Sequence, residues 1–111
     1  MELFRAVSPQ ELADIHQKAG FFSGPPSFQG KWFAEAPDHA AAWGRLLFQL
    51  SGTPFHVVGV DVPDAVANQM FRLPFLDRIG PARFADAALL SLINRSNRGI
   101  RELPVIILGT P

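Results

Sequence analysis

The first apolar run of the chain passes directly into a helix-start signal. Leu3 to Val7 is a short apolar segment that predicts a strand. Ser8-Pro9-Gln10-Glu11 then combines a serine that can accept a bond from a first-turn amide, a proline suited to the first helical position, and a glutamate that completes a capping box. Apolar residues follow at helical spacing until Gly20, which we expect to end the helix.

The middle of the chain alternates breaks with regular patterns. Glycines and prolines interrupt residues 21–30, which predicts a loop, and residues 31–34 form a short strand pattern. Residues 37–50 carry an apolar stripe at helical spacing, beginning at a proline. Residues 55–62 are rich in valine and give the strongest strand pattern of the chain.

The last part of the chain predicts two helices and a final strand. Pro63-Asp64 opens a short helix to about residue 71, residues 72–80 are a loop, and residues 81–96 form a longer helix. Residues 100–108 predict an edge or bent strand, because Pro104 interrupts it. Together these patterns predict a compact α+β fold, with one or two mixed β-sheets flanked by about four helices, in a single domain over residues 1–111.

Composition supports a folded and soluble domain. Of the 111 residues, 48% are hydrophobic and 18% charged, which is enough apolar material for a core. The chain contains no cysteine, which excludes disulfides and thiolate metal sites, and it shows neither a signal-peptide pattern nor a transmembrane segment. We therefore expect no membrane partner.

The formal net charge of zero conceals an asymmetry between the two halves. From residue 65 onward there are six arginines against three acidic residues, whereas acids are in excess before it. The C-terminal half could meet an anionic partner, or it could be an ordinary solvated surface. The three histidines lie in different predicted elements without metal-ligand spacing, so we expect no metal site.

Two cations stand out on the predicted strands. Arg5 lies within the first strand, so its guanidinium must reach water, pair with an acid, or bind a ligand anion. In Gly30-Lys31-Trp32-Phe33-Ala34, alternation places Lys31 and Phe33 on one face and Trp32 on the other. The glycine would allow a ligand to come close, and a cation beside an aromatic ring suits a ligand with phosphates and a flat ring. The alternative is that Trp32 fills the core and Lys31 is solvated.

Two further residues are candidates for a site. Arg83 would lie at the N-terminus of the helix over residues 81–96, where amide groups and the helix dipole favour an anion, although this is also an ordinary way for a helix to begin. Glu102, in the last predicted strand, could orient a ribose hydroxyl or stabilise an oxocarbenium ion. It could equally pair with Arg5 or Arg101.

Taken in order, these motifs resemble a known family. Leu3-Phe4-Arg5-Ala6-Val7-Ser8-Pro9, Gly30-Lys31-Trp32-Phe33-Ala34 and the alanine-rich segment 40–44 are similar to the compact ADP-ribosyltransferase-fold toxin domains at the C-termini of bacterial polymorphic and type VI-secreted effectors. The resemblance covers mainly residues 3–44. It implies a domain that acts in the cytoplasm of a target cell, is delivered by secretion as part of a larger effector, and is neutralised by a cognate immunity protein.

The resemblance also implies a substrate and roles for these residues. The substrate would be NAD, cleaved at its nicotinamide–ribose bond by a glycohydrolase or by an ADP-ribosyltransferase with a protein or nucleic-acid acceptor. Arg5 would hold phosphate and ribose, and Lys31-Trp32-Phe33 would line the nicotinamide side. Glu102 is the candidate late-strand glutamate. The family's E-x-E pair and its serine-threonine-serine element are missing, with Ala34 and Glu35 in the latter place, so Glu35 is an alternative acid.

Two other functions compete with this interpretation. A non-catalytic interaction domain, such as an immunity or adaptor protein, would place Arg5 in a structural ion pair and would have no deep pocket. A nucleic-acid binder is disfavoured by the zero net charge and by the lack of a basic aromatic platform. The toxin interpretation instead predicts a cleft at the first two strands, with Arg5 facing into it.

Overall fold

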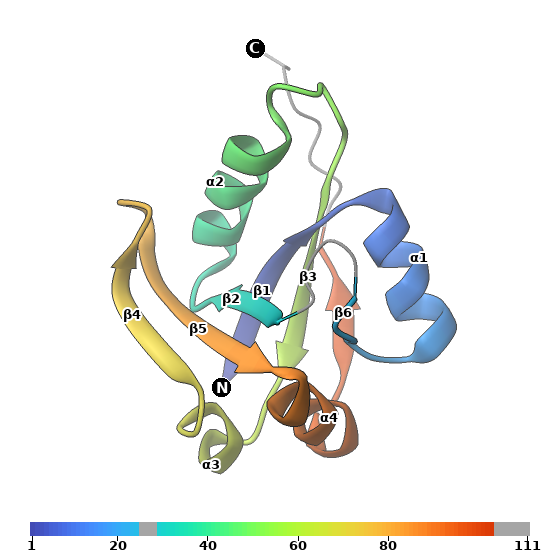
Figure 1. The fold of residues 1–111 in the computed structure, drawn as a ribbon, viewed down its shortest axis with the longest axis vertical. Helices are drawn as coiled ribbons and strands as arrows, with labels where there is room; N and C mark the ends of the chain where they lie inside the picture. Colours follow the sequence, from blue (N-terminus) through green and yellow to red (C-terminus); the bar gives the residue numbers. More distant parts are fainter. Residues whose placement is uncertain (25–28, 104–111) are drawn as a thin grey trace.

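The fold is a single antiparallel sheet with helices on both faces. The computed structural model describes residues 1–24 and 29–103. Ten elements follow in the order β1 (Glu2–Val7), α1 (Pro9–Lys18), β2 (Gly30–Ala34), α2 (Pro37–Phe48), β3 (His56–Asp61), α3 (Asp64–Ala67), β4 (Phe71–Leu76), β5 (Gly80–Asp86), α4 (Ala87–Ser96) and β6 (Ile100–Glu102) (Figure 1). The strand order is β4-β5-β2-β1-β3-β6. The predicted α+β class is confirmed, although all the strand pairs described are antiparallel, where we had expected mixed sheets.

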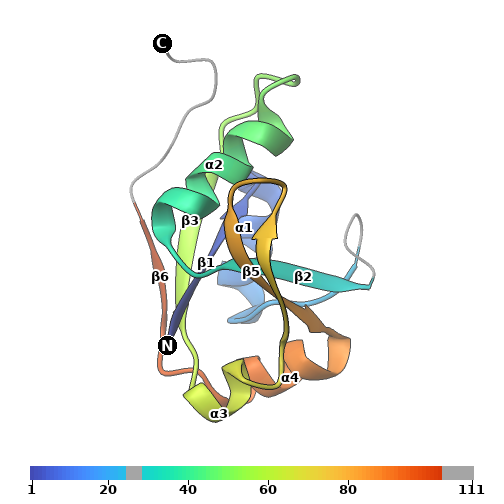
Figure 2. The ribbon, with the colours of Figure 1, turned by 90° about the vertical axis from the view of Figure 1, so that its left-hand side faces the viewer.

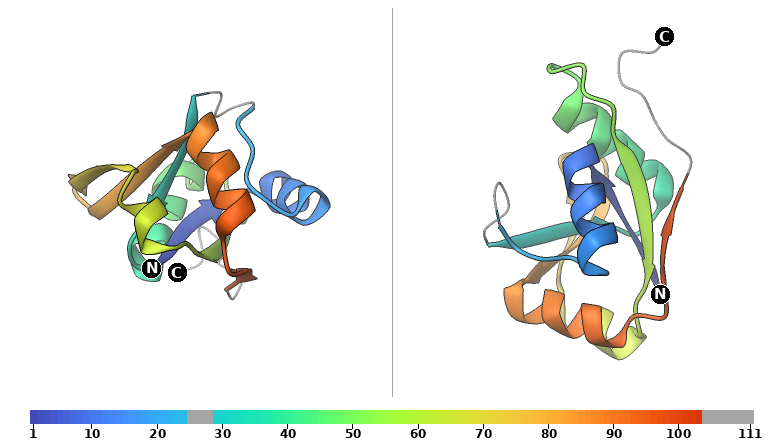
Figure 3. Two further views of the ribbon diagram at one scale, coloured as in Figure 1. Left: turned by 90° about the horizontal axis from the view of Figure 1, so that it is seen from below. Right: turned by 90° about the vertical axis from the view of Figure 1, so that its right-hand side faces the viewer.

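Each face of the sheet has its own hydrophobic core. Residues of β1 alternate between the two faces, so that Leu3 and Val7 contribute to one core and Phe4 and Ala6 to the other. The first core is closed by α1 and α4, and the second by α2. Figure 2 and the right-hand view of Figure 3 show α2 and α1 on opposite sides of β1 and β3.

The sheet opens between β1 and β2. Six residue pairs join β1 to β3, whereas Phe4 opposite Ala34 is the one register pair that joins β1 to β2. Beyond this pair the two strands diverge, and β2 crosses β1 at a steep angle (Figure 2). Side chains from β1, β2 and α1 therefore meet at a break in the sheet rather than on a continuous pleated surface.

The structure corrects the predicted loop over 72–80 and the predicted helix over 81–96. Residues 71–86 form a β-hairpin, and α4 begins only at Ala87. Asp77 and Arg78 both have positive φ, at 53° and 61°, which is a turn geometry usually signalled by Asn-Gly. The side chain of Asp86 caps α4 by accepting from the amide of Leu89. Pro81 and Phe84 therefore lie in a strand.

The boundaries of other elements also differ from the prediction. Helix α1 ends at Lys18, and the residue that caps it, Ala19, has φ of 55°. Gly20 is needed because a Cβ there would lie 2.6 Å from the side chain of Asn94. The short helix α3 ends at Ala67, before the predicted residue 71. The last strand is β6, Ile100–Glu102, and the rest of its predicted range, from residue 104, lies outside the described residues.

Candidate functional site

Arg5 joins three elements at the opening between β1 and β2. Its Nε and Nη2 donate to the two carboxylate oxygens of Glu11 in α1, at 2.7 and 3.0 Å. Its Nη1 donates to the backbone carbonyl of Trp32 in β2, at 3.0 Å. The side chain of Arg5 is only 15% exposed. Of the three possibilities left open by the sequence, the structure shows the ion pair with an acid, in the bidentate geometry that arginine forms with carboxylates.

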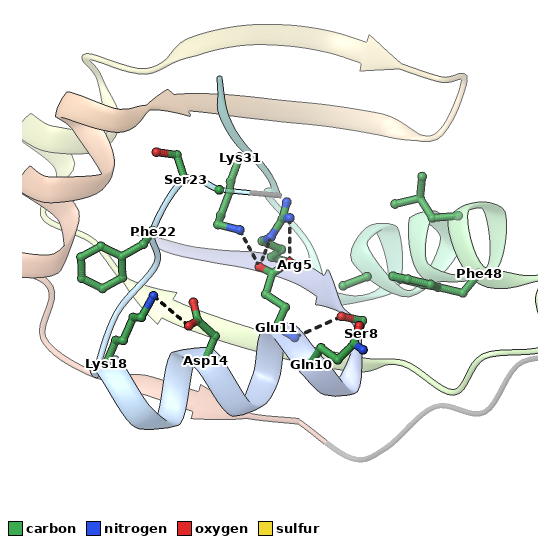
Figure 4. Close-up of a pocket in the computed structure, with 13 residues that line it drawn as sticks. Arg5, Ser8, Gln10, Glu11, Asp14, Lys18, Phe22, Ser23, Lys31 and Phe48 are labelled. Carbon is green, nitrogen blue, oxygen red and sulfur yellow. Dashed lines mark hydrogen bonds and ion pairs between the residues drawn. The ribbon is translucent and has the colours of Figure 1, made fainter. Parts of the chain in front are cut away.

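Lys31 approaches the same carboxylate from β2. Its Nζ lies 3.2 Å from Oε2 of Glu11, and its side chain is only 7% exposed, so the solvated alternative is wrong. One carboxylate thus lies between two buried cations, and the three side chains carry a formal charge of +1 (Figure 4). A buried excess charge is costly unless a counter-ion can reach it.

The pKa values of this cluster reflect its burial and its uneven charge. Burial by itself raises the pKa of Glu11, but the hydrogen bonds and charges of Arg5 and Lys31 outweigh it and leave that pKa below its usual value. The pKa of Lys31 is lowered, first by burial and then by repulsion from Arg5, with Glu11 acting in the opposite direction. Lys31 is therefore a cation whose charged form would be stabilised by a further anion.

The cluster forms one wall of a cavity of about 600 Å³. Phe22 and Phe48 supply aromatic surface, and Ser8 and Ser23 supply hydroxyl groups (Figure 4). An ion pair between Asp14 and Lys18, at 3.0 Å, also lines it. The volume lies within the range of about 300–1,000 Å³ typical of small-molecule sites. The lining suits a polar, anionic ligand that also carries a flat ring.

A second cavity, of about 280 Å³, lies where α2 faces the hairpin of β4 and β5. It is lined by two indole side chains, Trp32 and Trp43, and the indole N–H of Trp43 donates to Asp77 at 2.9 Å. Arg5 and Ala6 line both this cavity and the larger one. The two cavities therefore adjoin at the opening between β1 and β2.

Two other candidates of the 30–34 segment, Phe33 and Gly30, make close packing contacts within the fold. Phe33 shares a face with Lys31 as predicted, but it is 1% exposed and packs edge-on against Phe21. Gly30 has φ of 152°, and a Cβ there would lie 2.2 Å from the carbonyl oxygen of Ala85. The close approach that requires this glycine is thus made by β5.

Arg83 and Glu35 form a separate ion-pair group. Because residue 83 lies in β5, the predicted position at a helix N-terminus is wrong, and Arg83 donates instead to Glu35, at 2.8 Å, and to the carbonyl of Ala67. Arg72 donates to Glu35 as well, at 2.7 Å. The hydrogen bond from Arg72 and then the one from Arg83 lower the pKa of Glu35, against the effect of burial. Neither residue lines the cavities beside Arg5.

Glu102 lies level with Arg5 across the sheet, but it contacts different side chains. Both residues are in register with Val58 of β3, from opposite sides. The carboxylate of Glu102 lies 3.3 Å from Nδ1 of His56 and 3.6 Å from Nε2 of His16, in a third cavity that residues of α1 help to line. The structure does not bring Glu102 to Arg5.

The site residue that the sequence interpretation missed is Glu11. Its backbone amide donates to Ser8 at 3.1 Å, as expected for a cap, but its carboxylate turns to Arg5 and Lys31 rather than completing the capping box. The one available signal was a buried strand arginine that needed an acid, six residues before a glutamate.

Neither the side-chain clusters, nor the helices, nor comparison with known proteins assigns a function to the chain. The described residues contain no cluster of histidine and acidic side chains suited to a metal ion. None of the described helices is long and apolar enough to cross a membrane. No protein-family model matches the chain, and searches of curated proteins and of solved structures gave no significant match.

Proposed function

We propose that this domain consumes NAD by cleaving its nicotinamide–ribose bond, as a glycohydrolase or as an ADP-ribosyltransferase. The observation that carries the proposal is the cluster of Arg5, Glu11 and Lys31, which has an excess positive charge and lines the larger cavity, while Arg5 also lines the second. NAD combines a negatively charged diphosphate with two flat rings. The diphosphate would take the excess charge of Lys31, and a ring would lie against Trp32 in the second cavity.

The carboxylates near the cluster favour a catalytic acid other than Glu35 or Glu102. When the bond breaks, neutral nicotinamide leaves with the electron pair, positive charge develops on the ribose, and water or an acceptor hydroxyl adds and loses its proton. A nearby carboxylate stabilises that charge. Glu11 and Asp14 line the larger cavity, whereas Glu35 and Glu102 lie in other groups of side chains. Glu11 and Asp14 are therefore the acids to test first.

The biological setting that we propose follows the resemblance of the sequence. The domain would act as a toxin in the cytoplasm of a target cell, delivered by secretion as part of a larger effector. An immunity protein would protect the producing cell, and a transferase would also need a protein or nucleic-acid acceptor. Growth arrest on expression in a bacterium, relieved by a variant without turnover, would support this setting.

A second candidate function is a non-catalytic interaction domain. It is favoured by the ion pair of Arg5 with Glu11, which that function predicted. Apolar side chains are also exposed on α2 (Leu46, Leu47) and on β4 (Phe71, Phe75), where a protein partner could bind. The cavity beside Arg5 is the observation against it.

The deciding experiment is the release of nicotinamide from NAD by the purified protein, without an added acceptor. Arg5→Ala and Lys31→Met should abolish the release. Arg101→Ala is the matched control, because Arg101 also donates twice to one glutamate, Glu2, but lies outside the cavities and should leave turnover unchanged.

Absence of release has two explanations that thermal unfolding separates. An acceptor-dependent transferase should be stabilised by NAD, whereas an interaction domain should not be. The NAD proposal is wrong if NAD neither turns over nor raises the melting temperature of the folded protein. Circular dichroism of each variant establishes that any loss of activity is not a loss of fold.

A further inference from the structure

The Glu11 carboxylate occupies the position where a ligand anion would bind. It accepts two hydrogen bonds from Arg5 and lies within 3.2 Å of the Lys31 ammonium. An incoming phosphate group would need the same donors, because these cations line the cavity beside Glu11 (Figure 4). Glu11 thus has the position of an internal counter-ion.

The two cations are not equally engaged. Arg5 directs three of its N–H groups to Glu11 and to the backbone of β2, which holds its guanidinium in place. Lys31 has three N–H donors, and Glu11 is its one ion-pair partner among the described residues. A ligand anion can therefore bind Lys31 without breaking the bonds that fix Arg5.

We propose that Glu11 is a displaceable counter-ion, and that a diphosphate group in the cavity competes with it for Lys31. Arg5 then acts as a positioning residue that holds Glu11 against β1, and Lys31 is the cation that the ligand contacts. The excess charge beside the cavity indicates an anionic ligand. That the anion is a diphosphate rests on the proposed function.

The inference predicts whether removal of Glu11 strengthens or weakens anion binding. If Glu11 competes with the ligand, its removal should tighten anion binding. If Glu11 is needed to hold Arg5 and Lys31 in a binding geometry, its removal should weaken anion binding. Glu11→Gln has nearly the same shape and no charge, so it separates these two outcomes.

The experiment uses inorganic pyrophosphate as the probe, with binding to the full chain measured by calorimetry at neutral pH and low salt. We expect Glu11→Gln to bind pyrophosphate about tenfold more tightly than the unmodified protein, since a charge next to Lys31 is removed. Lys31→Met should bind at least tenfold more weakly. The melting temperature of each variant is measured first, so that only folded proteins are compared.

Glu2→Gln is the matched control for Glu11→Gln. Like Glu11, Glu2 accepts two hydrogen bonds from one arginine, Arg101, but it lies outside the cavity. Its removal changes the net charge by the same amount without removing a charge next to Lys31, so binding should change less than threefold. An equal tightening in Glu2→Gln would show a general charge effect and would overturn the proposal. So would weaker binding in Glu11→Gln, or no pyrophosphate binding by the unmodified protein.

Failure of this inference can be told apart from failure of the proposed function. Tightened pyrophosphate binding in Glu11→Gln, with neither NAD turnover nor thermal stabilisation by NAD in the unmodified protein, would support the displaceable counter-ion and contradict the proposed function. Nicotinamide release by the unmodified protein, together with weakened pyrophosphate binding in Glu11→Gln, would contradict the counter-ion and leave the function standing.

Discussion

Replacement of Glu11 by glutamine should destabilise the fold, and the loss should depend on pH. At neutral pH the substitution leaves Arg5 and Lys31, which are 15% and 7% exposed, without their shared carboxylate. Removing one partner of a buried ion pair costs roughly 3–5 kcal/mol. Glutamine keeps an oxygen that can accept one hydrogen bond, and the group has some contact with water, so we expect a loss of about 2–3 kcal/mol.

The pH dependence follows from the lowered pKa of Glu11. Between that pKa and the usual value of 4.5, the unfolded chain binds more protons than the folded chain, so stability increases with pH. The contribution of Glu11 is therefore fully present above pH 4.5 and is lost as the pH falls through the folded-state pKa. Glu2 and Glu35 also have lowered pKa values, but they titrate in both proteins, so their effects cancel in the comparison.

The assay is thermal denaturation of the two proteins between pH 3 and pH 7. For a chain of this size, 1 kcal/mol corresponds to a melting-temperature change of roughly 4 °C, so Glu11→Gln should melt about 10 °C lower at pH 7. The difference should shrink below pH 4.5. Glu2→Gln, whose partner Arg101 is largely exposed, should show a much smaller shift. Equal stability at pH 7, or a difference that persists unchanged in acid, would refute the reasoning.

Three other substitutions test the fold by chemical denaturation. Gly44→Ala should cost about 1–3 kcal/mol, against the gain of about 1 kcal/mol from helix propensity, because a Cβ would lie 2.2 Å from the buried ring of Phe55. Greater stability would contradict this packing. Asn94→Ala should cost about 1–3 kcal/mol, because Asn94 bonds both the amide and the carbonyl of Phe21, and an unchanged protein would argue against these bonds. Asp86→Ala should cost about 1 kcal/mol by removing the cap of α4, whereas no loss would favour the helix start predicted at residue 81.

The elements that could be predicted have strong local signals. The start of α1 was marked by Ser8 and Pro9, and the structure shows both in the expected roles. The alternation of β2 correctly placed Lys31 with Phe33. In each case a single local rule, a cap or a pleat, decides the outcome without any tertiary information.

The hairpin of β4 and β5 could not be predicted because its local signals point elsewhere. Its turn uses Asp77 and Arg78 at positive φ, without the glycine that usually accompanies this geometry. Residues 82–90 are rich in alanine and leucine, which favours a helix by propensity. Pairing of β5 with all five residues of β2 decides for a strand, and that partner lies about 50 residues away in the sequence.

The contacts of the candidate site were missed for a related reason. Glu11 fits the sequence pattern of a capping box, which predicted a local role for its carboxylate, but that carboxylate contacts Arg5 instead. Arg5, Glu11 and Lys31 meet only because β2 diverges from β1 and α1 packs over the opening. The sequence shows that a strand arginine needs a partner, but it does not show which acid reaches it.

From the sequence, an ion pair of Arg5 with an acid and a place for Arg5 in an anion site were alternatives. The two are compatible. A site built to bind an anion must carry excess positive charge, and in the empty protein that charge needs partial neutralisation to remain buried. Glu11 supplies one negative charge for two cations, which is enough to hold Arg5 and too little to satisfy Lys31. The same ratio of two cations to one carboxylate occurs where Arg72 and Arg83 share Glu35, but Glu35 and Arg83 do not line the cavities beside Arg5. The position of Lys31 in the wall of a cavity, together with the charge imbalance, is therefore what supports the proposed anion site.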